Sequence, residues 1–187
     1  MVLHHKPKID FESLFLKGIH GIAHSYRVLL IARKLADLER LPPFQKELLE
    51  FCAIFHDIGR EGDGVDYIHG QESIIILKEN HFFGASRFDL QLTRYIIENH
   101  CINDKKAFQI TGKYDLPDEA EGIYMLKLFK DSDNLDRFRL GDFNPDYLRI
   151  ENSHQLIPFA RDLNSKRFST FEIVKEFEGF MRNVVSN

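Results

Sequence analysis

Phe55-His56-Asp57-Ile58-Gly59-Arg60 is the stretch around which the chain is organised. It closes a run, residues 44 to 57, that is apolar on nearly every side, which predicts a buried central helix. Gly59 suits the end of that helix. An imidazole and a carboxylate are both good ligands for a divalent cation, and both can grip one ion where a helix ends. A single His-Asp pair is a weak signal, so its meaning depends on where the other histidines and aspartates fall.

The composition is that of an ordinary globular domain. A length of 187 residues suits one domain, and 43% hydrophobic residues are enough for a core. The net charge of -4 gives no general attraction to a nucleic acid duplex or a membrane, so any phosphate site must be local. No apolar run nears the roughly 20 residues that span a bilayer, and the N-terminus lacks a signal-peptide apolar region. Cys52 and Cys101 suggest no disulfide framework, and the expected location is cytoplasmic.

Helical periodicity dominates the sequence. Val28, Ile31, Leu35 and Leu38 recur at steps of three and four residues, which predicts a helix over 20–40. The same pattern predicts helices over 10–17, 44–57, 70–80, 88–100 and 118–136, and a last one after residue 169. We therefore predict an all-α domain of six to eight helices, with no internal repeat and no domain linker.

Shorter signals mark the boundaries of these helices. Ser169 and Glu172 form a capping box ahead of the last helix, and Ser86 with Asp89 fits a capping box before the 88–100 helix. The glycines of residues 59–64 predict a loop, and residues 103–116 look like a polar loop. Residues 153–164 are ambiguous between helix and loop.

Residues of metal-ligating type fall at or near the ends of five predicted elements. They are His24, His56, Asp57, His69, His100 and Asp133. Helix ends can converge on one side of a bundle, where helical proteins build metal sites. For any one of these histidines alone, a structural role in the core or at a helix cap is the more common one.

Three motifs make the sequence similar to a known family. They are His24-Ser25-Tyr26-Arg27, His56-Asp57 and Asp133-Asn134-Leu135-Asp136 with Arg139, in this order along the chain. In these motifs the chain resembles the HD-domain superfamily of metal-dependent phosphohydrolases. The resemblance covers roughly residues 20–141 as the metal-binding core, with 142–187 as a C-terminal helical extension of one domain, 1–187.

The resemblance implies one or two divalent ions as cofactor: Mn, Fe, Co, Ni, Zn or Mg. His69 and His100 resemble the two extra histidines of two-metal branches. The implied ligands form two sets that share Asp57: His24, His56 and Asp133 in the first, His69 and His100 in the second. Mixed nitrogen and oxygen ligation suits transition metals better than Ca.

Other residues near these motifs are candidates for catalysis and substrate binding. Asp57 and Arg60 are the expected catalytic residues, and Arg60, Arg139 and His20 are expected to contact substrate. Arg60 can clamp phosphate through its guanidinium, or it can form a loop ion pair with Glu61 or Asp63. Many family members carry an acidic residue at this place, so the general acid or base stays open.

Three further interpretations concern residues outside the ligand sets. For Arg27 a structural role is favoured, as a partner of Asp136 or Asp131. Phe138, Phe143 and Tyr147 are placed where a pocket rim could stack a base. Cys101, beside His100, shows no sign of being a nucleophile.

The expected function is hydrolysis of a nucleotide or a related small phosphate ester, mono- or diester, by metal-activated water. The chain lacks the Gly-Tyr-Pro signature of cyclic dinucleotide phosphodiesterases and the Glu-Asp pair of alarmone hydrolases, which disfavours both. Two alternatives stay open: a di-iron oxygenase with this fold, and a non-catalytic nucleotide-binding sensor. The expected partner is the small phosphate ester, with no nucleic acid duplex and no membrane, and a homodimer is left open.

Overall fold

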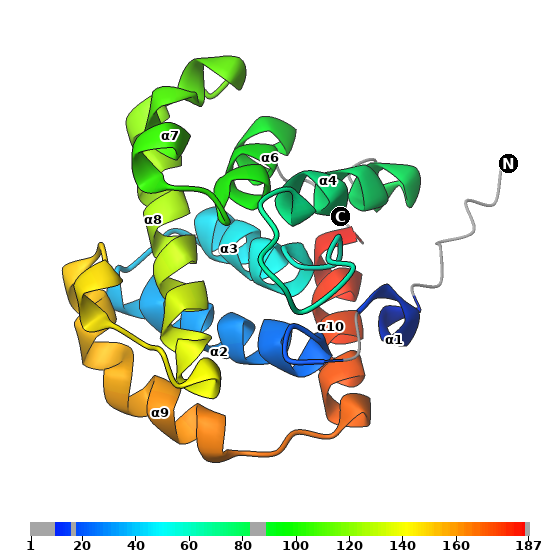
Figure 1. Ribbon diagram of the computed structural model, residues 1–187. Coiled ribbons are helices and arrows are strands. Elements are labelled where there is room, and N and C mark those ends of the chain that lie inside the picture. The colour runs from blue at the N-terminus through cyan, green and yellow to red at the C-terminus, as the bar shows by residue number, and fades with distance from the viewer. Residues whose placement is uncertain (1–9, 16–17, 83–88, 186–187) are drawn as a thin grey trace, which may run out of the picture.

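The computed structural model in Figure 1 describes residues 10–15, 18–82 and 89–185. Within these ranges the chain forms nine α-helices and no strand, so the predicted all-α class is confirmed. The α-helices are α1 (Phe11–Leu14), α2 (Ile22–Leu38), α3 (Pro43–Phe55), α4 (His69–Glu79), α6 (Leu90–Asn99), α7 (Asp104–Gln109), α8 (Glu119–Leu135), α9 (Ile157–Ser165) and α10 (Thr170–Val185). Four 3-10 helices are η1 (Thr111–Lys113), η2 (Asp136–Leu140), η3 (Pro145–Tyr147) and η4 (Glu151–Leu156).

Helix α7 lies where we expected a polar loop over 103–116, and that prediction is wrong for this stretch. Asn103 caps the helix by accepting a hydrogen bond from the backbone N–H of Lys105 at 2.9 Å. Ala107 is its one buried residue, and the Ala107 carbonyl accepts from the hydroxyl of Tyr95 at 3.2 Å. A helix of six residues with a single buried position shows no readable periodicity, which is why the sequence pattern missed it.

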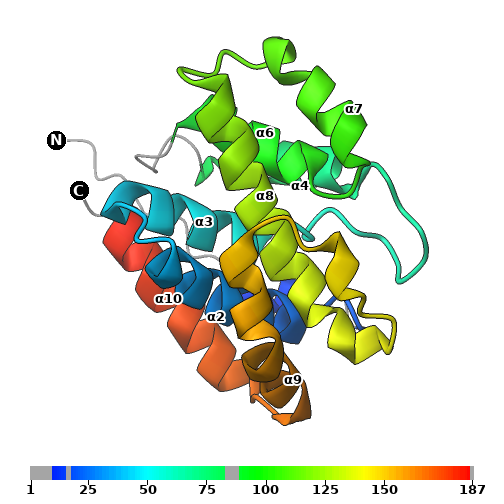
Figure 2. The same ribbon diagram turned by 90° about the vertical axis from the view of Figure 1, so that its left-hand side faces the viewer.

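Helix α3 lies at the centre of the fold, as the apolar sequence predicted. Every residue from Phe51 to Phe55 is buried. Figure 1 shows α2 packed along α3 and α8 running across both, and these three helices contact one another. In Figure 2, α10 lies along α2 on the side away from α4 and α6. The ends of α3, α6 and α8 and the starts of α2 and α4 thus surround one region.

Capping explains where two of these helices begin. Ser169 and Glu172 form the predicted capping box of α10, with reciprocal bonds of 3.0 Å and 3.2 Å between backbone N–H and side-chain oxygen. At α6 the expected capping box of Ser86 and Asp89 is wrong, because the helix begins later than that box requires. Asp89 is itself the N-cap and accepts from the N–H groups of Gln91 and Leu92, while Ser86 lies outside the described residues.

The C-terminal segment packs back on the core. Phe177 of α10 is buried and contacts the rings of Phe11, Phe15 and Tyr26. The ambiguous stretch 153–164 is the end of η4 followed by α9, which contacts α2 and η2. Among the described residues no helix has both the length and the apolar character needed to cross a membrane.

Candidate metal centre

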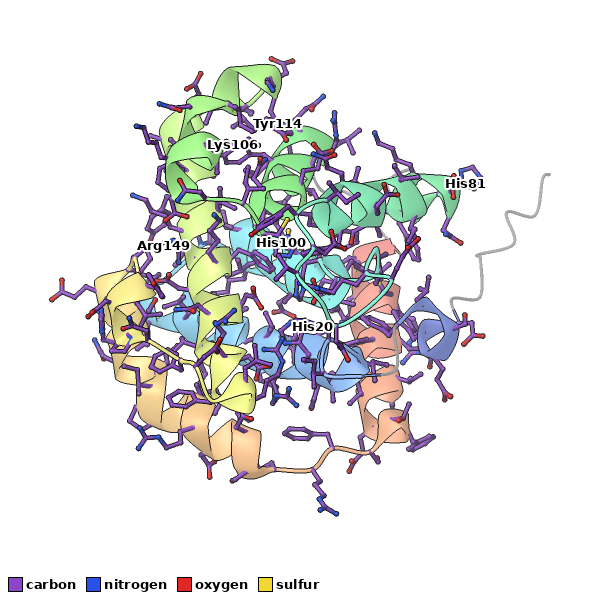
Figure 3. The ribbon with its side chains drawn as sticks, in the orientation of Figure 1. His20, His81, His100, Lys106, Tyr114 and Arg149 are labelled. Atoms are coloured by element: carbon purple, nitrogen blue, oxygen red, sulfur yellow. The ribbon has the colours of Figure 1, made fainter. Side chains whose placement is uncertain are left out.

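All six predicted ligands lie together where five helix ends meet. His24 lies in the first turn of α2, His69 begins α4, and Asp133 is in the last turn of α8. His56 and His100 are the residues that cap the C-terminal ends of α3 and α6. In Figure 3, His100 lies near the middle of the molecule with His20 just below it, whereas His81 is at the far end of α4. The four histidines of the set and Asp57 are buried.

The first donor set is built around two facing imidazoles. His24 Nε2 lies 3.1 Å from His56 Nε2 and 3.3 Å from Asp133 Oδ1. Asp57 Oδ2 lies 3.5 Å from His24 Nε2 and 3.6 Å from His56 Nε2. Two nitrogens and two carboxylate oxygens therefore point into one small space.

The second donor set uses the other oxygen of Asp57. His69 Nε2 lies 2.9 Å from His100 Nε2. Asp57 Oδ1 lies 3.1 Å from His69 Nε2 and 3.5 Å from His100 Nε2. Asp57 thus presents one oxygen to each set, as a bridging ligand must.

The hydrogen bond made by Nδ1 of each imidazole fixes Nε2 as the nitrogen that faces the donor set. The Nδ1 atoms of His56, His69 and His100 lie 3.1, 3.0 and 2.7 Å from the carbonyl oxygens of Ala53, Asp66 and Ile97, each three residues earlier. A carbonyl only accepts, so each Nδ1 carries the hydrogen and each Nε2 carries a lone pair. In His24 the carboxylate of Asp136 plays the same part, 2.8 Å from Nδ1.

This arrangement fits a divalent cation in each set. Two neutral imidazoles whose lone pairs face each other at 2.9 or 3.1 Å repel unless a proton or a metal ion lies between them. Asp57 Oδ1 is buried and has no hydrogen-bond partner, which is costly unless it binds a cation. Histidine with one carboxylate or two, each oriented by an outer partner, is a common donor set for divalent transition metals.

Electrostatics favour positive charge in the same place. Burial opposes protonation of His24, yet the carboxylates of Asp133, Asp136 and Asp57 raise its pKa to about 10. Burial also works against ionised Asp57, but the surrounding imidazoles hold its pKa well below the usual range. The carboxylates raise the pKa of His56 less than burial lowers it, so that pKa falls to about 3. A field that retains a proton on His24 also attracts a metal ion.

Asp136 is an outer partner whose role the sequence only partly indicated. Its carboxylate is fully buried, accepts from Arg27 Nε at 2.6 Å and Arg27 Nη2 at 3.0 Å, and orients His24. Arg27 therefore has the structural position that we favoured, and it pairs with Asp136 rather than Asp131.

The three residues predicted to meet substrate also lie at the centre. His20 Nδ1 is 3.2 Å from Asp57 Oδ2 and 3.0 Å from Arg139 Nη2. Arg139 is held in place by a bond from its Nε to the carbonyl of Ile19 at 3.0 Å. Arg60 Nε lies 3.2 Å from Asp57 Oδ2, and Arg60 Nη1 donates to the carbonyl of Gly64. Neither Glu61 nor Asp63, both within the described part of the chain, pairs with Arg60.

A cavity of about 360 Å³ opens beside the donor sets. Its lining includes Asp57, His69, His100 and Asp133, together with Arg60, Arg137, Arg139 and His20. Sequence reasoning did not single out Arg137, because its contribution depends on how η2 turns at the end of α8. Cys101 also lines the cavity, beside His100.

The aromatic residues expected at the rim lie elsewhere. The rings of Phe138 and Phe143 stack on each other with centroids 4.3 Å apart, and Tyr147 is exposed. None of the three lines the cavity, so a base-stacking role for them is not supported.

Two glycines let the elements of the centre approach closely. A Cβ on Gly59 would lie 2.4 Å from the carbonyl oxygen of His69, and a Cβ on Gly70 would lie 2.2 Å from that of Ile97. Gly59 does not have the positive φ of a helix-ending glycine. Its role is therefore close packing of the loop against α4, a correction to the expected helix stop. Gly70 lets α4 meet α6, which brings His69 to His100.

Comparison with known proteins gives one match. No curated protein and no solved structure matches the chain significantly. The model of the HD domain family matches residues 21–137, well over half of the chain, and this range contains all six residues of the two donor sets. The chain therefore belongs to the HD-domain family, whose members are mostly metal-dependent hydrolases.

Proposed function

We propose that this protein is a phosphohydrolase that cleaves a nucleotide or a related small phosphate ester with metal-activated water. The observation that carries the proposal is the pair of donor sets joined by Asp57, beside a cavity whose lining includes three arginines. Divalent ions bound there would polarise a phosphoryl oxygen and lower the pKa of a bound water toward neutral.

The arginines are suited to orient the phosphate. Arg60 lines the cavity, and its guanidinium is held in place by Asp57 Oδ2, 3.2 Å from Nε, and by the carbonyl of Gly64. Arg139 is fixed by the carbonyl of Ile19 and lies against His20. A planar guanidinium binds phosphate through two parallel bonds, and fixed arginines lose little entropy in doing so.

The cavity suits a small polar ligand. Its volume of about 360 Å³ lies at the lower end of the range for small-molecule sites. The protein as a whole carries a charge of -4, so the arginines and the metal centre would be the local attraction for an anion. These features support a mononucleotide or a smaller phosphate ester as substrate.

The test is metal analysis of the purified chain followed by a screen of phosphate esters and nucleotides with Mn, Co, Ni, Fe and Mg. We expect one or two ions per chain and phosphate release that depends on the added metal. Two irons with oxygen consumption and no phosphate release would instead favour an oxygenase. Tight nucleotide binding without hydrolysis under any metal would identify a sensor.

Asp57→Ala provides the sharpest variant, because it removes one donor from each set. We expect loss of bound metal and of turnover, with the helical circular dichroism spectrum unchanged. Asp63→Asn is the matched control, since Asp63 lines the same cavity but belongs to neither donor set. It should keep its metal. Turnover retained in Asp57→Ala would refute the mechanism.

A further inference from the structure

Cys101 lies next to the second donor set and the proposed mechanism does not use it. It follows His100 directly at the end of α6 and lines the same cavity as His69 and His100. Its Sγ and one ring nitrogen of each of these histidines all lie within 4.8 Å of one another.

These separations are close to those of ligands on one ion. With Zn–S near 2.3 Å and Zn–N near 2.0–2.1 Å, a sulfur and a nitrogen on one tetrahedral ion lie about 3.5–3.6 Å apart. Rotation about the single side-chain torsion of Cys101, moving Sγ by about 1 Å, therefore brings Sγ within bonding distance of an ion held by His69 and His100.

The two donor sets differ in how many ligands the chain supplies without Cys101. The first has His24, His56, Asp133 and Asp57 Oδ2, whereas the second has only His69, His100 and Asp57 Oδ1. Asp57 Oδ1 is the buried oxygen without a hydrogen-bond partner, and it points at His69 and His100. That oxygen independently marks the second set as a place for a cation.

We propose that Cys101 is the fourth protein ligand of the second ion, which makes this a mixed nitrogen, oxygen and sulfur site. The inference rests on the proposed metal centre. In the structure Cys101 Sγ donates to the carbonyl of Tyr67 at 3.4 Å, and a thiol is a weak donor. On metal binding the thiol proton passes to water, and a metal–sulfur bond replaces that contact.

A thiolate ligand would change what the second site accepts. Two neutral imidazoles, the shared carboxylate and a thiolate favour Zn, Co or Fe over Mg or Mn, because sulfur is a soft donor. The added negative charge also lowers the net positive charge at the second ion relative to a site of two histidines and one carboxylate. Cys101 would thus make the two sites unequal in metal preference.

The test uses the full chain loaded with Co²⁺ or Zn²⁺ in three forms: wild type, Cys101→Ser and Cys52→Ala. Cys52→Ala is the matched control, since Cys52 is the one other cysteine and is buried in the core. The readouts are the near-ultraviolet thiolate-to-cobalt charge-transfer band and a sulfur neighbour about 2.3 Å from zinc in X-ray absorption.

We expect both signals in wild type and Cys52→Ala and neither in Cys101→Ser. A metal-loaded wild type with only nitrogen and oxygen neighbours would overturn the role of Cys101 and leave the metal centre standing. A signal that persists in Cys101→Ser would overturn it as well. A wild-type chain that binds neither metal would overturn the metal centre itself, and this inference with it.

Discussion

At the residue scale, His24 differs from the other three histidines of the donor sets in the group that orients its imidazole. His56, His69 and His100 each donate to a backbone carbonyl three residues earlier, which no substitution of a side chain can remove. His24 depends on the side chain of Asp136. The first donor set is therefore the one whose geometry a mutation outside the ligands can disturb.

Asp136→Asn tests this dependence while keeping the size of the side chain. The asparagine oxygen can take the place of only one carboxylate oxygen, so the NH₂ group faces either Arg27 Nε, or both Arg27 Nη2 and His24 Nδ1. We expect metal affinity at the first site to fall about 10- to 100-fold, the usual effect of losing an outer partner. We also expect stability to fall by about 3 kcal/mol or more, because Arg27 loses its buried counter-ion.

Competition titration with a chelating dye and urea unfolding measure these two effects. Asp142→Asn is a suitable control, since Asp142 pairs with Arg137 at the surface, where such pairs contribute about 1 kcal/mol at most. Unchanged metal affinity in Asp136→Asn would show that His24 is oriented by something other than this carboxylate.

At the element scale, a buried carboxylate of α8 attaches the C-terminal segment. Asp131 accepts from the backbone N–H groups of Arg149 and Ile150 and from the hydroxyl of Ser153, each at 2.8 Å. The Arg149 guanidinium also pairs with Asp104 of α7 at 2.7 Å. Figure 3 shows Arg149 to the left of His100, and Arg149 does not line the cavity beside the donor sets, so this network holds elements together without entering the metal centre.

Asp131→Ala should therefore separate stability from metal binding. The change leaves two backbone N–H groups and one hydroxyl without their acceptor, at about 1–3 kcal/mol each where they stay dry. We expect the free energy of unfolding in urea to drop by several kcal/mol while metal content at 25 °C is unchanged. Asp118→Ala, which removes the exposed cap of α8, should cost only about 1 kcal/mol. A loss no larger than that of the cap variant would contradict the anchoring role of Asp131.

At the scale of the whole molecule, the sequence predicted features that depend on neighbouring residues better than contacts between distant parts of the chain. Periodicity predicted the long helices, and the capping box at Ser169 was found where expected, because both depend on residues a few positions apart. The HD-domain motifs predicted the family and the six residues that meet at the centre. Their identity as ligands stays a prediction until an ion is found.

The remaining features depend on contacts between distant parts of the chain. Gly59 looked like a helix stop, but it is needed because α4 passes within contact of the loop. Arg149 showed no local pattern, since its partners Asp104 and Asp131 lie 45 and 18 residues away. The proposal that Cys101 is a ligand arises only because α4 brings His69 beside His100. No spacing rule along the sequence predicts such approaches.

The same convergence makes the whole protein sensitive to pH when no metal is bound. The pKa of His24 is raised to about 10 in the folded protein, against about 6.5 in an unfolded chain. Its proton therefore stabilises the fold fully below pH 6.5, and this contribution is lost as pH rises toward 10. His56 acts in the opposite direction, because its pKa of about 3 makes the unfolded chain bind the extra proton between pH 6.5 and pH 3.

Metal-free protein should thus lose about 1 kcal/mol of unfolding free energy per pH unit between pH 7 and pH 8.5, because folded His24 keeps its proton in this range and unfolding releases it. With excess Zn²⁺ or Co²⁺ the slope should vanish or reverse, because the ion takes the place of the proton and binds more tightly as protons become scarce. Urea unfolding at several pH values, with chelator or with metal, measures both slopes. His24→Gln should flatten the metal-free slope, and an unaltered slope in that variant would mean that the carboxylates around His24 do not govern the pH dependence.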